Sequence, residues 1–208
     1  MMGSNTDLAK PTQKPPAPPI LPYAVAGVLF ALLMFGAAGF LWFGTSARAA
    51  IGGPFTLVNG AGQQVTDRSF RGKYMLVYFG YTYCPDVCPT TLQSLAGALD
   101  ALGAKANDVA PIFITVDPAR DTPAVMQRYA AVFSPRLIGL TGTPAEITQV
   151  EKEYHVYAAK HVTGPGPNDY GMDHSSVIYV MGPDGRFIAP LAEAAPKQMA
   201  ADLAKLMS

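Results

Sequence analysis

Beyond residue 50, apolar residues fall into short blocks, and the periods of these blocks predict alternating strands and helices. Residues 74–79 and 110–116 are almost unbroken apolar runs, which are typical of central strands covered on both faces of a sheet. Between these runs, leucines recur at spacings of three and four from Leu92 to Leu102. They form one apolar stripe and predict a helix over about 89–104.

Turn and cap signals predict the remaining elements. Glycine-containing turns at 59–62 and 182–185 each separate two short apolar runs and predict two β-hairpins. Thr122-Pro123 and the capping box Thr143-Pro144-Ala145-Glu146 each mark the start of a helix. Further elements are expected as strands at 137–140 and 156–160 and as a helix at 196–207. The fold class is therefore α/β, with a central sheet flanked by helices and with extra hairpins.

A long apolar segment precedes this domain. Residues 15–47 contain no charged residue and no histidine, and 23–44 are almost wholly apolar. As a helix, 23–44 would be roughly 33 Å long, enough to cross a hydrocarbon core of about 30 Å. The segment predicts one transmembrane helix. The alternative is a cleaved signal peptide with Ala47-Arg48-Ala49 at the cleavage site.

The positions of basic residues predict the orientation of this helix. Lys10 and Lys14 precede the span and only Arg48 closely follows it, so the positive-inside bias places the N-terminus in the cytoplasm. The tail lacks the character of a mitochondrial transit peptide, which favours a single-pass protein of a bacterial inner membrane with its soluble domain in the periplasm. The expected parts are a disordered proline-rich cytoplasmic tail (1–22), a transmembrane helix (23–44), a linker (45–52) and one folded domain (53–208).

Charge and cysteine content reduce the number of possible functions. The 15 basic and 15 acidic residues balance, and no basic cluster indicates nucleic-acid binding. The chain has 2 cysteines, Cys84 and Cys88. A static disulfide between them would close so short a loop that it adds little stability through chain entropy, so a chemical role is favoured.

The cysteine pair is expected where a buried strand ends and a helix begins, which is typical of a thioredoxin-like architecture. Positions four apart share one helix face, and the helix N-terminus favours thiolates, so both sulfurs should be good nucleophiles and ligands. Cys84 and Cys88 have three intervening residues, one more than the usual redox pair. A dithiol–disulfide couple and a soft ion between the sulfurs both remain open. Copper is favoured over structural zinc, which takes about four ligands.

A third ligand must come from a distant segment. His174 lies in a glycine-rich polar stretch just before the strand expected at 177, and we expect it in a loop where Asp173 and Ser175 orient its ring. His155 and His161 are expected to have no role, and Met172 to serve packing. Asp117, Arg120 and Asp121 are expected to serve turn and cap chemistry.

Three stretches resemble the SCO/SenC family of membrane-anchored copper proteins. They are Tyr78 to Pro89 with the two cysteines, Thr115 to Pro123, and Asp173-His174-Ser175. The resemblance implies a thioredoxin-like copper-binding domain in which Cys84, Cys88 and His174 ligate Cu(I) or Cu(II).

The resemblance also implies a function and partners. It implies a metallochaperone rather than an enzyme, which delivers copper to, or matures, the binuclear copper site of cytochrome c oxidase subunit II. The alternative is a thiol–disulfide reductase that acts on the oxidase copper-site cysteines through Cys84 and Cys88. An upstream copper donor and a thiol reductant are further expected partners. A gating role for His174 is a hypothesis, because release of one ligand would open a coordination position.

Overall fold

The computed structural model describes residues 32–35 and 51–208. Residues 32–35 are helical and belong to an N-terminal unit, 1–49, while 51–208 belong to a second unit. The predicted tail lies outside the described residues, as do the predicted span and linker apart from 32–35 and 51–52. Among the residues that are described, no helix is both long and apolar enough to cross a bilayer.

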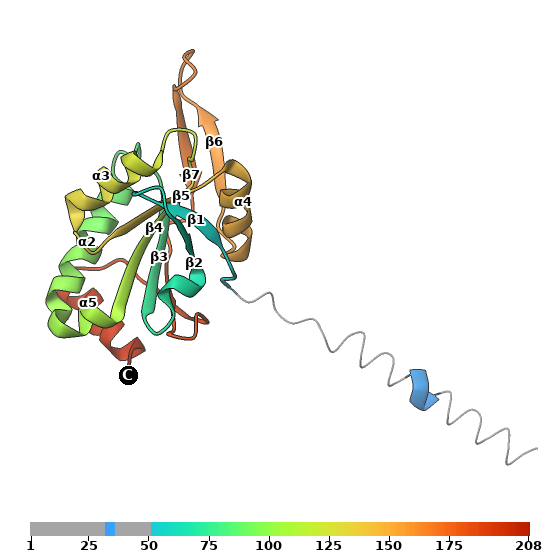
Figure 1. Ribbon diagram of the computed structural model, residues 1–208, viewed down its shortest axis with the longest axis vertical. Helices are drawn as coiled ribbons and strands as arrows, with labels where there is room; N and C mark the ends of the chain where they lie inside the picture. Colours follow the sequence, from blue (N-terminus) through green and yellow to red (C-terminus); the bar gives the residue numbers. More distant parts are fainter. Residues whose placement is uncertain (1–31, 36–50) are drawn as a thin grey trace, which may run out of the picture. The chain divides into compact units, whose positions relative to one another are not determined.

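Seven strands form one mixed sheet in the order β2-β1-β5-β4-β3-β8-β9 (Figure 1). The strands are β1 Thr56–Asn59, β2 Gln64–Thr66, β3 Tyr74–Gly80, β4 Val109–Thr115, β5 Ile138–Thr141, β8 Ile178–Met181 and β9 Phe187–Leu191. The central strands β3, β4 and β5 run parallel, while β1 and β8 are antiparallel to their inner neighbours. Both hairpins predicted from glycine-containing turns are present, at opposite edges of the sheet.

Helices cover both faces of this sheet (Figure 1). They are α2 Val87–Leu102, α3 Pro123–Phe133, α4 Pro144–Glu153 and α5 Pro196–Leu206, with 3-10 turns η1 Asp67–Phe70 and η2 Gly103–Asp108. Residues of α2, α3 and α5 pack on one face, and residues of α4 and η1 pack on the other. The capping box at the start of α4 forms as predicted, because the Thr143 hydroxyl accepts from the Glu146 amide and the Glu146 carboxylate accepts from the Thr143 amide.

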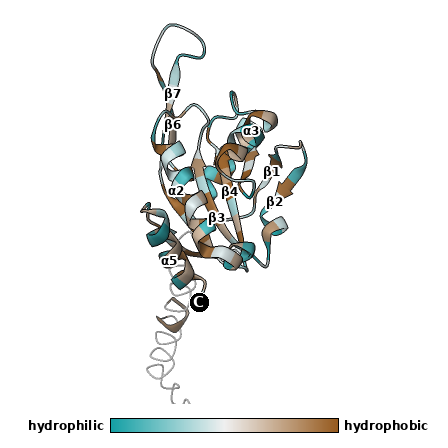
Figure 2. Cartoon of the chain, turned by 90° about the vertical axis from the view of Figure 1, so that its left-hand side faces the viewer, coloured by the Kyte–Doolittle hydropathy of each residue, from teal (hydrophilic) through white to brown (hydrophobic). Residues whose placement is uncertain are grey.

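Strand β3 shows why its sequence has no polar positions. Leu76 and Tyr78 point toward α2, whereas Met75, Val77 and Phe79 point toward α4. All five side chains are buried, so both faces of the strand lie in a hydrophobic core. In Figure 2, hydrophobic residues, drawn in brown, recur along the central strands. The α/β architecture expected from the apolar runs is confirmed.

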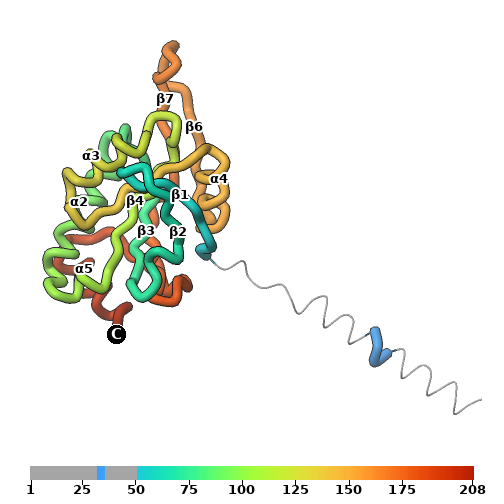
Figure 3. The backbone as a smooth tube through the Cα atoms, viewed as in Figure 1, coloured from blue at the N-terminus to red at the C-terminus, as the bar shows by residue number. Residues whose placement is uncertain are grey.

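A separate two-stranded ribbon projects from the end of the folded domain opposite the C-terminus (Figures 1 and 3). It consists of β6 Ala158–Val162 and β7 Tyr170–His174, with Ala158 paired to His174. The predicted strand at 156–160 therefore begins two residues later than expected. The prediction that His174 lies in a loop is wrong. The cause is pairing to β6, together with a Ser175 amide that donates to the Tyr157 carbonyl oxygen at 3.0 Å.

Candidate metal centre

The cysteine pair lies between the end of β3 and the first turn of α2. Cys84 is in the turn before the helix, and its amide donates to the carbonyl oxygen of Tyr81 at 3.2 Å. Cys88 is the second residue of α2, and its amide donates to Cys84 Sγ at 3.3 Å. Both are free thiols in the structure. The predicted strand–cysteine–helix arrangement is therefore confirmed.

Gly80, the last residue of β3, allows this close approach. A Cβ atom at Gly80 would lie 2.6 Å from Cys88 Sγ and 2.9 Å from Cε2 of Phe113. Both distances are far shorter than van der Waals contact, so any side chain here would displace the sulfur or the ring. The sequence alone gave Gly80 no role. The only indication of a close approach was the position of Gly80 at the end of an apolar strand just before the cysteines, because a glycine within a strand often marks such an approach.

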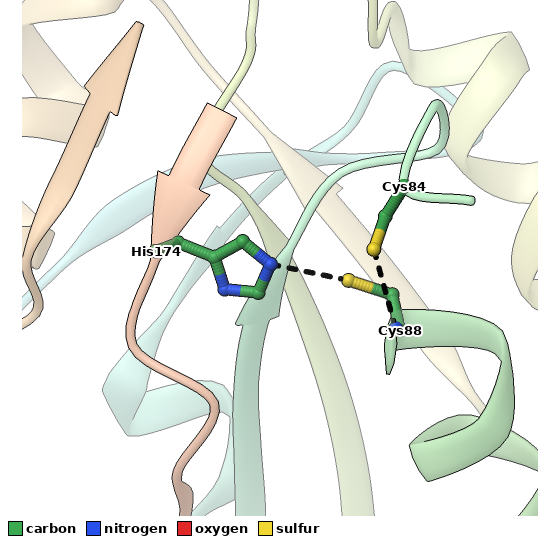
Figure 4. A group of neighbouring side chains, drawn as sticks. All are labelled: Cys84, Cys88 and His174. Carbon is green, nitrogen blue, oxygen red and sulfur yellow. Dashed lines mark hydrogen bonds between the residues drawn. The ribbon is translucent and has the colours of Figure 1, made fainter. Parts of the chain in front are cut away.

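The imidazole of His174 approaches the sulfurs from the end of β7 (Figure 4). Its Nδ1 lies 3.1 Å from the backbone oxygen of Ser175. A carbonyl oxygen only accepts, so Nδ1 carries the proton of the neutral ring and Nε2 keeps its lone pair. Nε2 lies 3.3 Å from Cys88 Sγ. The ring therefore presents the nitrogen that a metal ion requires toward the thiols.

The residues that flank His174 behave differently from each other. Ser175 orients the ring as expected, but through its backbone oxygen, while its hydroxyl accepts from the Tyr157 amide at 3.1 Å. The prediction for Asp173 is wrong, because its carboxylate faces Nδ1 of His161 at 3.4 Å on the exposed side of the ribbon. Adjacent residues of a strand point to opposite faces, which explains why Asp173 turns away from His174.

Three donor atoms thus converge, one each from Cys84, Cys88 and His174, and all lie within 4.8 Å of one another. In the part of the chain that the structure describes, this is the one such group of histidine, cysteine and acidic side chains. Cys88 is fully buried, whereas Cys84 and His174 are half-buried. Two sulfurs and one nitrogen fit a soft ion such as copper, and the half-exposed donors leave an approach from solvent.

Burial changes the acid–base chemistry of the deeper thiol. It raises the pKa of Cys88 to about 12, and the neighbouring Cys84 adds to this rise. The prediction that the helix N-terminus makes both sulfurs thiolates is therefore wrong for Cys88 in the metal-free protein, because loss of hydration outweighs the helix dipole. A metal ion bound at Cys88 must displace this proton.

The buried carboxylate of Asp121 fixes the cysteine turn to the end of β4. It accepts from the Thr82 amide at 3.0 Å, from the Thr82 hydroxyl at 2.5 Å and from the Thr115 hydroxyl at 2.6 Å. Burial also raises the pKa of Asp121, against the effect of these hydrogen bonds. Asp121 therefore joins two segments that are distant in sequence, while Thr122 caps α3 as expected.

Arg120 joins the ribbon to the cysteine turn. It forms a buried ion pair with Asp117 and donates to the Tyr170 carbonyl oxygen at 3.0 Å. Its Cζ lies 3.6 Å from the ring centre of Tyr170, on β7, and 4.6 Å from that of Tyr83, beside Cys84. The Tyr170 hydroxyl in turn donates to Asp117 at 2.9 Å. Turn and cap chemistry therefore describes only part of what this segment does.

The structure also places the other candidates named from the sequence. His155 and His161 are outside the group of converging donor atoms. Met172 packs against the hydrophobic core on the α4 face. Among these candidates, only Cys84, Cys88 and His174 contribute atoms to the converging donor group.

Comparison with known proteins places this arrangement in a family. The SCO1/SenC family model matches residues 44–208. The chain belongs to the SCO1/SenC family. Protein SenC of Rhodobacter capsulatus is 46% identical over 157 residues, which cover 76% of this chain and 70% of SenC. The chain spans about half the length of most of the curated relatives it matches.

Solved structures of the family share the fold. The copper-bound structure of ScoI from Bradyrhizobium japonicum is 50% identical, with a TM-score of 0.70, and the match covers 76% of this chain and 99% of ScoI. BsSco, described as a Sco-family cytochrome c oxidase assembly protein with a disulfide switch, is 26% identical with a TM-score of 0.58, covering 76% of this chain and 94% of BsSco. The fold is therefore the thioredoxin-like α/β fold of Sco proteins, with a mixed sheet flanked by helices.

Proposed function

We propose that this protein binds copper through Cys84, Cys88 and His174 and acts as a metallochaperone in the assembly of cytochrome c oxidase. The observation that carries the proposal is the convergence of two sulfurs and one imidazole nitrogen within 4.8 Å. The copper-bound structure of ScoI from Bradyrhizobium japonicum supports the proposal, and so does BsSco, which is described as a cytochrome c oxidase assembly protein. The finer proposal is delivery of copper to the binuclear copper site of subunit II.

The cysteines, His174 and Ser175 have different roles in binding and releasing copper. The Cys84 and Cys88 sulfurs provide soft, charged donors, which suit Cu(I), and the imidazole adds a nitrogen that also suits Cu(II). The Ser175 carbonyl holds the His174 ring in the tautomer that leaves Nε2 free. Cys84 is half-exposed and Cys88 is buried, so a partner's thiol would approach a bound copper ion from the Cys84 side and replace that ligand first.

The cellular setting is part of the same proposal. A single N-terminal membrane helix over 23–44 would hold the folded domain at the periplasmic face of a bacterial inner membrane, close to a membrane-embedded oxidase. An upstream copper donor and a thiol reductant would then act on the same half-exposed Cys84.

A thiol–disulfide reductase is the second candidate, and the unequal exposure of the two thiols favours it. A half-exposed sulfur beside a buried one suits attack by Cys84 on a partner disulfide followed by resolution by Cys88. In that exchange the pair is oxidised to a Cys84–Cys88 disulfide, while the disulfide of the oxidase copper site is reduced to two thiols.

Copper loading of the purified full chain separates the two candidates. With Cu(II), the proposal predicts strong sulfur-to-copper charge-transfer absorption that is lost in Cys84→Ser and in Cys88→Ser. His174→Ala should weaken Cu(II) binding more than Cu(I) binding, and His161→Ala is the matched control that should change neither. Rapid reduction of insulin disulfides by a chain that retains no copper would contradict the chaperone proposal and favour the reductase.

A further inference from the structure

Three buried polar atoms in the described part of the chain have no hydrogen-bond partner. They are the hydroxyl oxygens of Tyr78 and Tyr129 and Nη2 of Arg120. An unpaired buried donor costs about 1–3 kcal/mol, so each calls for an explanation. Two of the three residues lie beside the candidate centre, because the Tyr78 ring lies 6.5 Å from the His174 ring and Arg120 Cζ lies 4.6 Å from the ring centre of Tyr83, in the cysteine turn.

Tyr78 is the more direct case. It lies on β3, fully buried, with its ring stacked on Phe113 at 6.0 Å and its hydroxyl beside the side chains of Cys88 and Thr91. The Thr91 hydroxyl already donates to Glu193 at 2.9 Å. A neutral thiol is a weak acceptor, whereas a thiolate is a strong one. The Tyr78 hydroxyl therefore gains a strong acceptor when Cys88 loses its proton to a bound metal ion.

Tyr129 reaches the same region from α3. Its ring lies 5.7 Å from the ring of Phe113, on the face of the sheet that α2, α3 and α5 cover and that also holds Cys88. The pKa of a phenol is ordinarily about 10, so both hydroxyls carry their protons at neutral pH and can serve as donors.

We propose that the Tyr78 and Tyr129 hydroxyls are positioning donors that stabilise negative charge on the metal-bound cysteine sulfurs and so favour Cu(I) over Cu(II). This inference rests on the proposed copper binding. Two thiolates and a neutral imidazole around Cu(I) carry one net negative charge, whereas around Cu(II) they carry none. Cu(II) also withdraws more charge from sulfur, so hydrogen bonds to the sulfurs strengthen the Cu(I) form more.

Removal of each hydroxyl tests the proposal. In Tyr78→Phe, the affinity for Cu(I) should fall roughly tenfold and at most about a hundredfold, which is the usual range for a hydrogen bond to a charged group. The affinity for Cu(II) should fall less, and each tenfold difference lowers the reduction potential of the bound copper by about 59 mV. The sulfur-to-copper absorption should move to longer wavelength. Tyr129→Phe should act in the same direction.

A second readout separates this role from a structural one. Since neither hydroxyl has a partner in the metal-free protein, both variants should keep or exceed the metal-free unfolding temperature. Tyr154→Phe is the matched control, because Tyr154 is equally buried on the opposite face of the sheet and should leave the copper affinities unchanged.

The outcomes are distinct. A lower metal-free unfolding temperature in Tyr78→Phe would show that its hydroxyl is already bonded, for example to Thr91, and would overturn the proposal. Unchanged copper affinities in both phenylalanine variants, with a normally loaded wild type, would overturn this inference alone. A wild type that binds no copper would overturn the proposed function and this inference together.

Discussion

The cysteine side and the histidine side of the candidate centre are held by different interactions. Cys88 lies within the hydrophobic core between β3 and α2, where the neighbouring strand is buried on both faces. His174 ends a two-stranded ribbon in which most residues of β6 and β7 are half-buried or exposed. Its ties to the rest of the domain include the hydrogen bonds from Arg120 to the Tyr170 carbonyl oxygen and from the Tyr170 hydroxyl to Asp117.

This difference implies unequal local stability. Segments with few buried apolar contacts open at a lower free-energy cost than the core. The two sulfurs should therefore stay together when the ribbon moves, and the imidazole should be the ligand that can leave. A site built in this way can keep Cu(I) on two sulfurs while it loses the nitrogen that Cu(II) prefers.

The largest effect is expected from a substitution that removes Arg120, the residue that links the ribbon to the end of β4. Arg120→Ala leaves the buried Asp117 carboxylate without its cation, and loss of one partner of a buried pair costs about 3–5 kcal/mol. We expect this cost to appear as faster amide hydrogen exchange in β6 and β7, with smaller changes in β3. Arg136→Ala is the control, because the Arg136 side chain makes an exposed hydrogen bond to Asn107. Equal loss of protection in β3 and β7 would contradict unequal stability.

Two glycine-to-alanine substitutions compare the core beside Cys88 with the ribbon, because an added Cβ atom meets its nearest atom at the same distance in both places. A Cβ at Gly80 would lie 2.6 Å from Cys88 Sγ, and a Cβ at Gly171 would also lie 2.6 Å from its nearest atoms, in the ring of His161. The sulfur is locked in the core, so Gly80→Ala should lower the free energy of unfolding by about 1–3 kcal/mol. The His161 ring is half-exposed and can swing away, so Gly171→Ala should cost less than about 0.5 kcal/mol. Chemical denaturation measures both, and equal costs would contradict the comparison.

The same contrast explains what the sequence could predict. The run at 74–79 and the leucine stripe of α2 follow directly from burial in the core, so the cysteine side was predicted closely. Strand β7 has glycine and polar residues because a thin ribbon buries little, so its pattern resembled a loop. The role of Asp121 depends on Thr82, 39 residues earlier. Such a contact leaves no local periodicity to detect.

A proton measurement distinguishes the buried sulfur from the imidazole. Burial raises the pKa of Cys88 to about 12, so this thiol is protonated at neutral pH and must release its proton when copper binds. Because binding releases this proton, the affinity for Cu(I) should rise about tenfold per pH unit, or about 1.4 kcal/mol, as the pH increases toward the pKa of Cys88. Potentiometric titration at pH 7 with Cu(I) should show at least one proton released per ion, and His174→Ala should retain this release. No release from the wild type would mean that Cys88 is already a thiolate.

Removal of a single hydroxyl tests how many contacts hold the ribbon in place. Tyr170→Phe removes the hydroxyl that donates to Asp117 at 2.9 Å but keeps the ring beneath the Arg120 guanidinium. Because the acceptor is a buried carboxylate, loss of this hydrogen bond should cost about 1.5 kcal/mol, and amide exchange should show it in β7. Tyr157→Phe is the control, because the Tyr157 side chain is exposed and its ties to Ser175 are made by the backbone. If Tyr170→Phe left β7 unchanged, the ion pair and the stacked ring alone would hold the ribbon, and the histidine side would depend on fewer contacts than its geometry indicates.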